Sequence, residues 1–101
     1  MIEKFDIYYT RFYYDDRVGS KKRPTLVIDV VDDIVVCAKI TSKEKRFGSD
    51  YEVRDWKESG LKEPSVIRFG DLQPVDVKYI GEKWGHLTEY DIDVITSTPF
   101  I

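Results

Sequence analysis

The stretch of sequence that decides the fold covers residues 23–42 and reads RPTLVIDVVDDIVVCAKITS. It holds two runs of apolar, mostly β-branched residues, 25–31 and 34–41, which favour extended strands. Asp32 and Asp33 separate the runs and suit a tight turn, because aspartate tolerates left-handed backbone angles. Since neither run alternates regularly with polar residues, we expect a hairpin whose strands are buried on both faces.

Shorter strand-like segments surround this hairpin. Residues 5–14 are rich in aromatic side chains and predict a strand, whereas residues 15–22 read as a polar loop. After the hairpin, a charged connection leads to further extended segments at 51–53, at 64–69 and within 75–84. The chain is therefore expected to contain five or six short strands.

One helix is expected near the C-terminus. Thr88 suits an N-cap with Asp91 three residues later, and Leu87 and Ile92 occupy the two positions of a hydrophobic staple. The helix should run to about residue 96. Residues 1–101 therefore predict one domain of the α+β class, mostly β, with a compact barrel-like sheet and a C-terminal helix.

The charge is unevenly distributed along the chain. The net charge is −3, which argues against a protein that binds nucleic acid without specificity. Residues 1–46 nevertheless carry 10 Lys or Arg against 8 Asp or Glu, or +2, whereas residues 47–101 carry 6 against 11, or −5. A local basic patch attracts a polyanion even on an acidic protein. The charge distribution is therefore compatible with a localised anion-binding site within residues 1–46.

The sequence offers few metal ligands. Cys37 is the only cysteine and His86 the only histidine, which excludes an intrachain disulfide and a zinc site built from several cysteines. The adjacent aspartates at 15–16 and 32–33 fall in expected turns, so we predict no metal site and no cofactor. A lone cysteine fits a reducing cytoplasm, and neither a signal peptide nor an apolar run of membrane-spanning length is visible.

The first candidate site lies where the two central strands begin and end. Arg23 precedes Pro24, which restricts it to extended backbone angles, and a guanidinium is a rigid fork of donors that suits phosphate oxygens. Thr41 and Ser42 place two hydroxyls where the second strand runs out, and such hydroxyls can donate to an oxyanion. On the sequence pattern alone, however, a solvated basic hinge at residues 21–23 is the favoured interpretation, and the two hydroxyls are typical of an ordinary strand end.

A second candidate surface interleaves basic and aromatic side chains. Such mixtures bind single-stranded nucleic acid, because rings stack on bases while cations follow the phosphates. Strand alternation places residues 8, 12 and 14 on the core face, which leaves Tyr9, Arg11 and Tyr13 for a ligand or a partner subunit. The residues predicted to bind RNA are Arg11, Tyr13, Arg17, Ser20, Lys21 and Lys22.

Several motifs occur in a telling order along the chain. They are RPTLVI at 23–28, AKITS at 38–42, DWKESGL at 55–61, PSVIR at 64–68 and GHLT at 85–88. In this order they resemble the MazF/PemK family of toxin endoribonucleases from type II toxin–antitoxin modules. The similarity extends over about residues 5–95, and the segment 55–61 resembles the PemK-like branch in particular.

The resemblance implies a fold, an activity and partners. It implies a small SH3-like barrel of the CcdB/MazF/PemK type that forms a homodimer in the cytoplasm. It also implies metal-independent cleavage of single-stranded RNA, typically mRNA, and inhibition by an antitoxin protein that covers the RNA groove. DNA would then be a partner only indirectly, through the antitoxin.

The resemblance also implies site residues. Arg23 and Thr41 match the two residues at the family's cleavage centre, and Arg68 matches an arginine implicated in Kid-type members. Ser42 and Asp71 are further candidates for catalysis or RNA contact. Kid-type members place an acid two residues after the later arginine, where this chain has a glycine followed by Asp71, and their loop histidine is missing.

The implied chemistry has three requirements. A ribose 2′-hydroxyl must lose a proton as it attacks phosphorus, the extra charge must be stabilised, and the 5′-oxygen must gain a proton. Arg23 can supply charge stabilisation and Thr41 a hydrogen bond, but an arginine is a poor base, so the base is left open. Two alternatives also remain: a noncatalytic poison of a protein target such as gyrase, as in CcdB-type proteins, and an inactive nucleic-acid-binding module.

Overall fold

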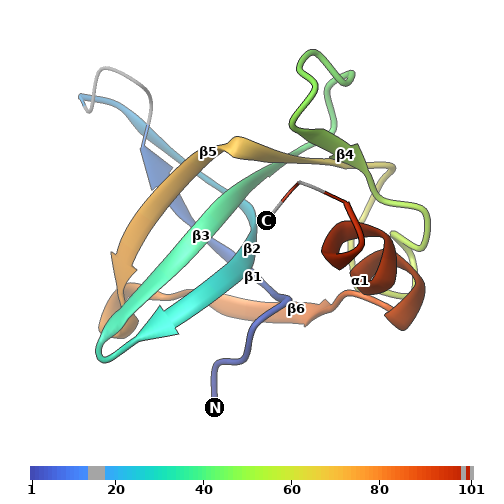
Figure 1. The fold of residues 1–101 in the computed structure, drawn as a ribbon. Helices are drawn as coiled ribbons and strands as arrows, with labels where there is room; N and C mark the ends of the chain where they lie inside the picture. The colour runs from blue at the N-terminus through green and yellow to red at the C-terminus, as the bar shows by residue number, and fades with distance from the viewer. Residues whose placement is uncertain (14–17, 99, 101) are drawn as a thin grey trace.

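The computed structural model of the chain describes residues 1–13, 18–98 and 100. Its strands form one antiparallel sheet in the order β4-β5-β3-β2-β1-β6, which leaves β4 and β6 at the two edges. The sheet curves strongly, and the single helix lies between these two edges (Figure 1). The elements are β1 (Asp6–Tyr13), β2 (Ser20–Val31), β3 (Ile34–Thr41), β4 (Asp50–Glu52), β5 (Val66–Asp76), the 3-10 turn η1 (Val77–Tyr79), β6 (Glu82–His86) and α1 (Glu89–Thr96). The predicted mostly-β class is confirmed, although the sheet is open rather than hydrogen-bonded into a closed barrel.

The central hairpin is formed by β2 and β3, as the sequence predicts. Asp32 in the turn adopts a left-handed backbone conformation with φ 54°. Leu26 belongs to the main core, whereas its neighbour Val27 belongs to a second cluster on the opposite face of the sheet. The prediction that these strands are buried on both faces is therefore confirmed for residues 25–27 and 35–41, whereas Val30, Val31 and Ile34 next to the turn are exposed.

Two strands are longer than the sequence suggests. β2 begins at Ser20 rather than at residue 25, because its first residues pair with β1 up to the pair of Tyr13 with Ser20. The expected loop–strand junction at Arg23 is thus wrong, since Arg23 lies inside β2 opposite Thr10. β5 continues to Asp76 along β3, with an irregularity that shifts the register between Ala38 and Lys39.

Helix α1 is held to the β4 edge by one buried carboxylate. Asp91 is fully buried and accepts hydrogen bonds from the backbone N–H groups of Arg54 (3.0 Å) and Asp55 (2.9 Å) and from the hydroxyl of Tyr51. Thr88 stands at the N-cap position, but its hydroxyl donates to the Asp55 carboxylate instead of capping the helix backbone. The helix thereby bridges the two sheet edges and closes the core on that side.

A close approach of two backbones positions the segment that follows β4. Gly60 has φ +93°, and a Cβ on it would lie 2.1 Å from the carbonyl oxygen of Trp84. A Cβ on Gly85 would lie 2.0 Å from the carbonyl oxygen of Ser59. Glycine is required on both sides of this contact, which fixes residues 61–65 against β6. Among the described residues, no helix has the length and apolarity needed to cross a membrane.

Candidate nucleic-acid interface

Strand pairing places Arg23 and Thr41 side by side. The antiparallel register pairs Thr25 of β2 with Lys39 of β3. This is the last pair of the β2–β3 ladder on that side. Extending the same register by two residues beyond it places Arg23 across from Thr41, although 18 positions separate the two in the sequence. These two side chains form a ridge between two hollows in the surface, and both residues line both hollows.

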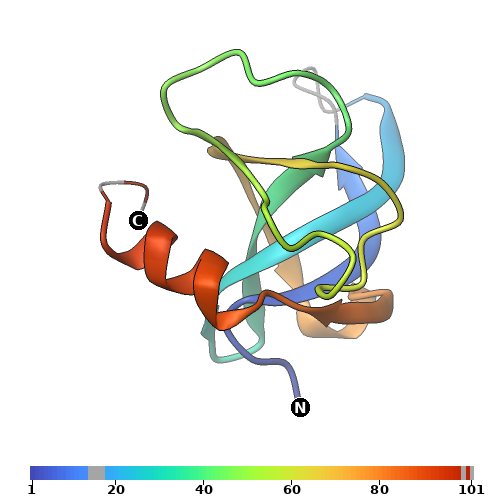
Figure 2. The same cartoon turned by 90° about the vertical axis from the view of Figure 1, so that its right-hand side faces the viewer.

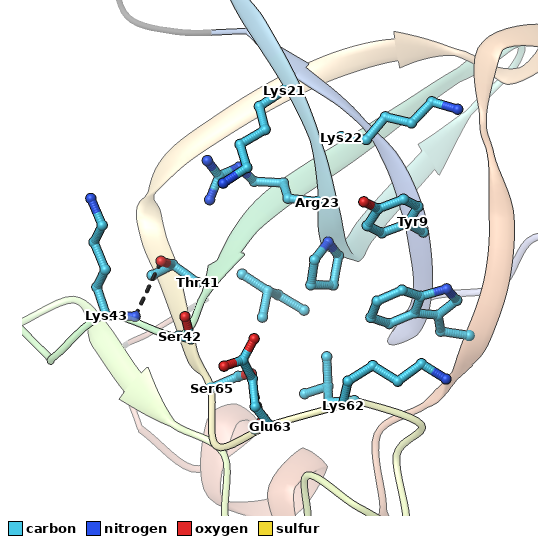
Figure 3. A pocket seen from close by; sticks show the side chains of 14 residues that line it. Tyr9, Lys21, Lys22, Arg23, Thr41, Ser42, Lys43, Lys62, Glu63 and Ser65 are labelled. Carbon is cyan, nitrogen blue, oxygen red and sulfur yellow. Dashed lines mark hydrogen bonds between the residues drawn. The ribbon is translucent and has the colours of Figure 1, made fainter.

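The first hollow has a volume of about 470 Å³ and is strongly cationic. It lies between β2, the end of β3, the segment 61–65 and β6, and Figure 3 shows the side chains that line it. Five of its lining residues are cations, and one is an acid, Glu63. The lining residues are Tyr9, Lys21, Lys22, Arg23, Pro24, Ile40, Thr41, Ser42, Lys43, Leu61, Lys62, Glu63, Ser65 and Trp84.

The Arg23 guanidinium is available to a ligand. Within the part of the chain that the structure describes, it makes neither a hydrogen bond nor an ion pair, and in Figure 3 it lies beside Lys21, on the side of Thr41. Thr41 is only 7% exposed, and its Oγ1 accepts a hydrogen bond from the backbone N–H of Lys43 at 3.3 Å. Its hydroxyl proton therefore remains free to be donated, while Ser42 next to it is exposed.

One wall of this hollow is aromatic. The rings of Tyr9 and Trp84 stack with centroids 4.7 Å apart and planes 4° from parallel, and the Lys62 ammonium lies 5.0 Å from the centroid of the Trp84 ring. Strand alternation places Tyr9 on the ligand side, but no local signal in the sequence singles out Trp84 or Lys62. Neither residue was predicted, since the pairing of β1 with β6 brings Trp84 to this site and the close approach of Gly60 to β6 brings the segment with Lys62.

The second hollow, of about 520 Å³, contains two of the other candidates. The guanidinium of Arg68 donates to the Asp50 carboxylate at 2.8 Å, and both side chains are buried. The Asp50 carboxylate also accepts the backbone N–H groups of Arg46 and Phe47, so this ion pair ties β5 to the loop before β4. Asp71 lies 3.8 Å from the Lys39 ammonium on the same side.

The predicted aromatic and basic residues of β1 line a different hollow. Arg11 and Tyr13 belong to a third depression, of about 450 Å³, which shares only Tyr9 and Lys22 with the first. The Arg11 guanidinium donates to the Ser20 hydroxyl at 2.9 Å, so these two candidates are engaged with each other. Of the remaining candidates, Lys21 and Lys22 line the first hollow, and Arg17 lies outside the described residues.

The single histidine is exposed and is bonded to a buried carboxylate away from these hollows. His86 Nδ1 lies 2.7 Å from the fully buried Asp6 carboxylate, and the Lys83 ammonium lies 3.5 Å from the same oxygen. Burial alone would raise the pKa of the Asp6 carboxyl, but the bonds from His86 and from the Glu3 N–H and the charge of Lys83 outweigh it, so that the pKa is lowered. Among the described residues, no group of three or more His, Cys, Asp or Glu side chains is arranged to hold a metal ion.

Comparison with known proteins gives a family and a fold. The model of the family described as PemK-like, MazF-like toxin of type II toxin-antitoxin system matches residues 3–98. No curated protein sequence matches the chain.

Solved structures are similar at low sequence identity. An endoribonuclease in complex with its cognate antitoxin from a mycobacterial species has a TM-score of 0.75 and 13% identity, with 95% of this chain and 88% of that chain covered. The Mycobacterium tuberculosis toxin MazF-mt6 has a TM-score of 0.70 and 23% identity, with coverages of 91% and 89%. Another mycobacterial endoribonuclease has a TM-score of 0.69 and 12% identity, with coverages of 92% and 82%. At these identities the likeness shows a shared fold.

Proposed function

The chain belongs to the family of PemK-like, MazF-like toxins of type II toxin–antitoxin systems, and on this premise we propose that it is an endoribonuclease that cleaves single-stranded RNA. One observation carries the proposal. The guanidinium of Arg23, which has no partner among the described residues, and the hydroxyl of Thr41 both line a cationic hollow. A fork of donors next to a hydroxyl is suited to the non-bridging oxygens of a phosphodiester.

The reaction uses the substrate's own nucleophile. The ribose 2′-oxygen attacks the adjacent phosphorus, the bond from phosphorus to the 5′-oxygen breaks, and a 2′,3′-cyclic phosphate and a 5′-hydroxyl result. Arg23 stabilises the negative charge that builds up on the phosphorane, and Thr41 donates a hydrogen bond to a non-bridging oxygen. Neither role requires a metal ion, so we propose that cleavage proceeds in the presence of a chelator.

The wall of the hollow suits a single strand. Unpaired bases can stack on an aromatic surface while the backbone follows the cations, and a duplex keeps its bases away from such a surface. We expect the stacked pair of Tyr9 and Trp84 to receive a base next to the scissile phosphate, with Lys21, Lys22 and Lys62 neutralising neighbouring phosphates. Because the 2′-hydroxyl is the nucleophile, DNA of the same sequence should bind at best and remain uncut.

The partners follow from family membership. A structure with the same fold holds an endoribonuclease together with its cognate antitoxin. We propose that this chain is likewise inhibited by an antitoxin, whose acidic segment would compete with RNA for the cationic hollow. We also propose that it acts in the cytoplasm, as a homodimer.

The test is cleavage of a varied pool of single-stranded RNAs by the purified protein. We expect the wild type to cut and Arg23→Ala to lose at least about 10²-fold in rate, the loss seen when one preorganised charge stabiliser is removed. Lys57→Ala is the matched control, because Lys57 is exposed, carries the same charge and does not line the hollow. Failure of the wild type to cut any RNA, or full activity in Arg23→Ala, would contradict the proposal.

A further inference from the structure

Cleavage by the proposed route needs a group that removes the 2′-hydroxyl proton. Arg23 cannot serve well, because a guanidinium stays protonated at any physiological pH. The residues that line the first hollow include no histidine, and His86 is bonded to Asp6 elsewhere. Among the described residues that line it, Glu63 is the one carboxylate. A carboxylate is a common general base in enzymes.

The backbone of Glu63 is fixed on both sides. Leu61, two residues before it, is buried in the main core, and Pro64 directly after it restricts Glu63 to extended angles. The buried Ser65 hydroxyl then donates to the Glu63 carbonyl oxygen at 2.8 Å. The close contact of Gly60 with β6 holds the same segment from its N-terminal side. Glu63 therefore projects from an anchored segment rather than from a free loop.

The side chain of Glu63 points into the hollow. In Figure 3 its carboxylate rises from the segment 61–65 toward the strand end that carries Thr41 and Ser42. Among the described residues it forms no ion pair, although five cations line the same hollow. The Glu63 carboxylate is therefore left to contact a ligand bound in the hollow.

From this placement we propose that Glu63 is the general base of the RNA cleavage, an inference that rests on the proposed function. The Glu63 carboxylate takes the proton from the ribose 2′-hydroxyl while the 2′-oxygen forms its bond to phosphorus. The bond to the 5′-oxygen breaks, and this oxygen takes a proton from water at the mouth of the hollow. Glu63 then returns its proton to solvent, so each cycle ends with the carboxylate ionised.

The same geometry sets the direction of the attack. Arg23 and Thr41 lie on the strand side of the hollow and Glu63 on the opposite side, in the segment 61–65. For Glu63 to act as the base, a phosphate bound to the strand side must present the ribose that carries the attacking 2′-hydroxyl toward Glu63. The base and the charge stabiliser would then act on different atoms of one phosphodiester, as general base catalysis combined with electrostatic stabilisation requires.

The experiment measures cleavage of single-stranded RNA as a function of pH for the wild type, Glu63→Gln and Glu63→Asp. Glutamine keeps the size of the side chain and cannot accept the proton. We expect Glu63→Gln to lose about 10²-fold or more in rate and to lose the acidic limb of the pH profile, and Glu63→Asp to retain that limb at a lower rate. Glu58→Gln, an exposed acid that does not line the hollow, is the matched control and should behave as the wild type.

A second measurement separates chemistry from binding. Affinity for an RNA with a 2′-deoxy nucleotide at the scissile position should be unchanged or higher in Glu63→Gln, since a negative charge has been removed from a phosphate-binding hollow. If the wild type cleaves and Glu63→Gln cleaves equally fast with the same acidic limb, the Glu63 proposal is wrong and the endoribonuclease function stands. If the wild type cleaves no RNA, the proposed function itself fails.

Discussion

Two arginines were predicted from the sequence as site residues, and they differ in their surroundings in the structure. Arg68 is 7% exposed and bonded to the buried Asp50 carboxylate, whereas Arg23 has no partner among the described residues. We predict that Arg68→Ala unfolds the protein readily and that Arg23→Ala does not. The reason is that the first change leaves a carboxylate buried without its countercharge.

The magnitude follows from the burial of the pair. Removing one partner of a buried ion pair costs about 3–5 kcal/mol in the free energy of unfolding. For a domain of this size about 1 kcal/mol lowers Tm by roughly 4–8 °C, so Arg68→Ala should lower Tm by about 12 °C or more. Arg23→Ala should stay within about 0.5 kcal/mol of the wild type, as substitutions away from buried networks usually do. Urea and thermal unfolding followed by circular dichroism measure both.

A double variant tests the reason given for this difference. Asp50→Asn keeps an oxygen that can accept the N–H groups of Arg46 and Phe47 but removes the buried charge. Combined with Arg68→Met it should recover a large part of the stability that Arg68→Ala loses. A Tm of Arg68→Ala within about 2 °C of the wild type, or a double variant no more stable than Arg68→Ala, would refute the ion-pair explanation.

Three further predictions concern other parts of the molecule. The pKa of Asp6 is lowered on folding, so its contribution to the free energy of unfolding is present above the unfolded pKa of 3.8 and is lost as the pH falls through the lowered folded pKa. Urea unfolding measured from pH 7 to pH 2 should therefore show a smaller loss of stability for Asp6→Asn than for the wild type. Trp84→Ala should weaken the binding of single-stranded RNA by about 1–3 kcal/mol in a titration, whereas Tyr79→Ala, a change at an exposed tyrosine, should leave the affinity unchanged. Equal affinities for Trp84→Ala and the wild type would argue against stacking of an RNA base on Trp84. Gly85→Ala should lose about 1–3 kcal/mol of stability, because its Cβ would lie 2.0 Å from the Ser59 carbonyl oxygen. An unaltered Tm would mean that β6 and the segment with Ser59 can move apart at no cost in free energy.

The parts of the fold that the sequence predicted well depend on local signals. β3 has the predicted bounds of residues 34–41, because a turn of two aspartates precedes it and polar residues follow it. The helix was placed correctly by Thr88 and by the apolar positions around it. The length of β5 was missed, because Gly70 and Pro74 interrupt its apolar pattern while pairing with β3 sustains it. Partner strands, which no local pattern reveals, decide such cases.

The same distinction applies to the site. Arg23 and Thr41 could be found because motif order pointed to both of them. Trp84 and Glu63 could not, since each becomes notable only when β6 and the segment 61–65 fold against β2 and β3. The engagement of Arg68 by Asp50 is equally invisible in the sequence, because nothing in the intervening residues marks the two as partners. Motif order thus singles out Arg23 and Thr41 as candidates, whereas the residues of the walls opposite them carry no local signal.

The central claim is that the chain cleaves RNA through the substrate's own 2′-hydroxyl at the Arg23–Thr41 ridge. The most direct measurement is analysis of the product ends, by mass spectrometry, after incubation of single-stranded RNA with the protein in a chelator. We predict a 2′,3′-cyclic phosphate, or the monophosphate formed when its ring is hydrolysed, on one fragment and a free 5′-hydroxyl on the other. A substrate with a single 2′-deoxy nucleotide at the scissile position should not be cut. A 5′-phosphate on the product, cleavage of the 2′-deoxy substrate, or complete loss of cutting in the chelator would contradict the account.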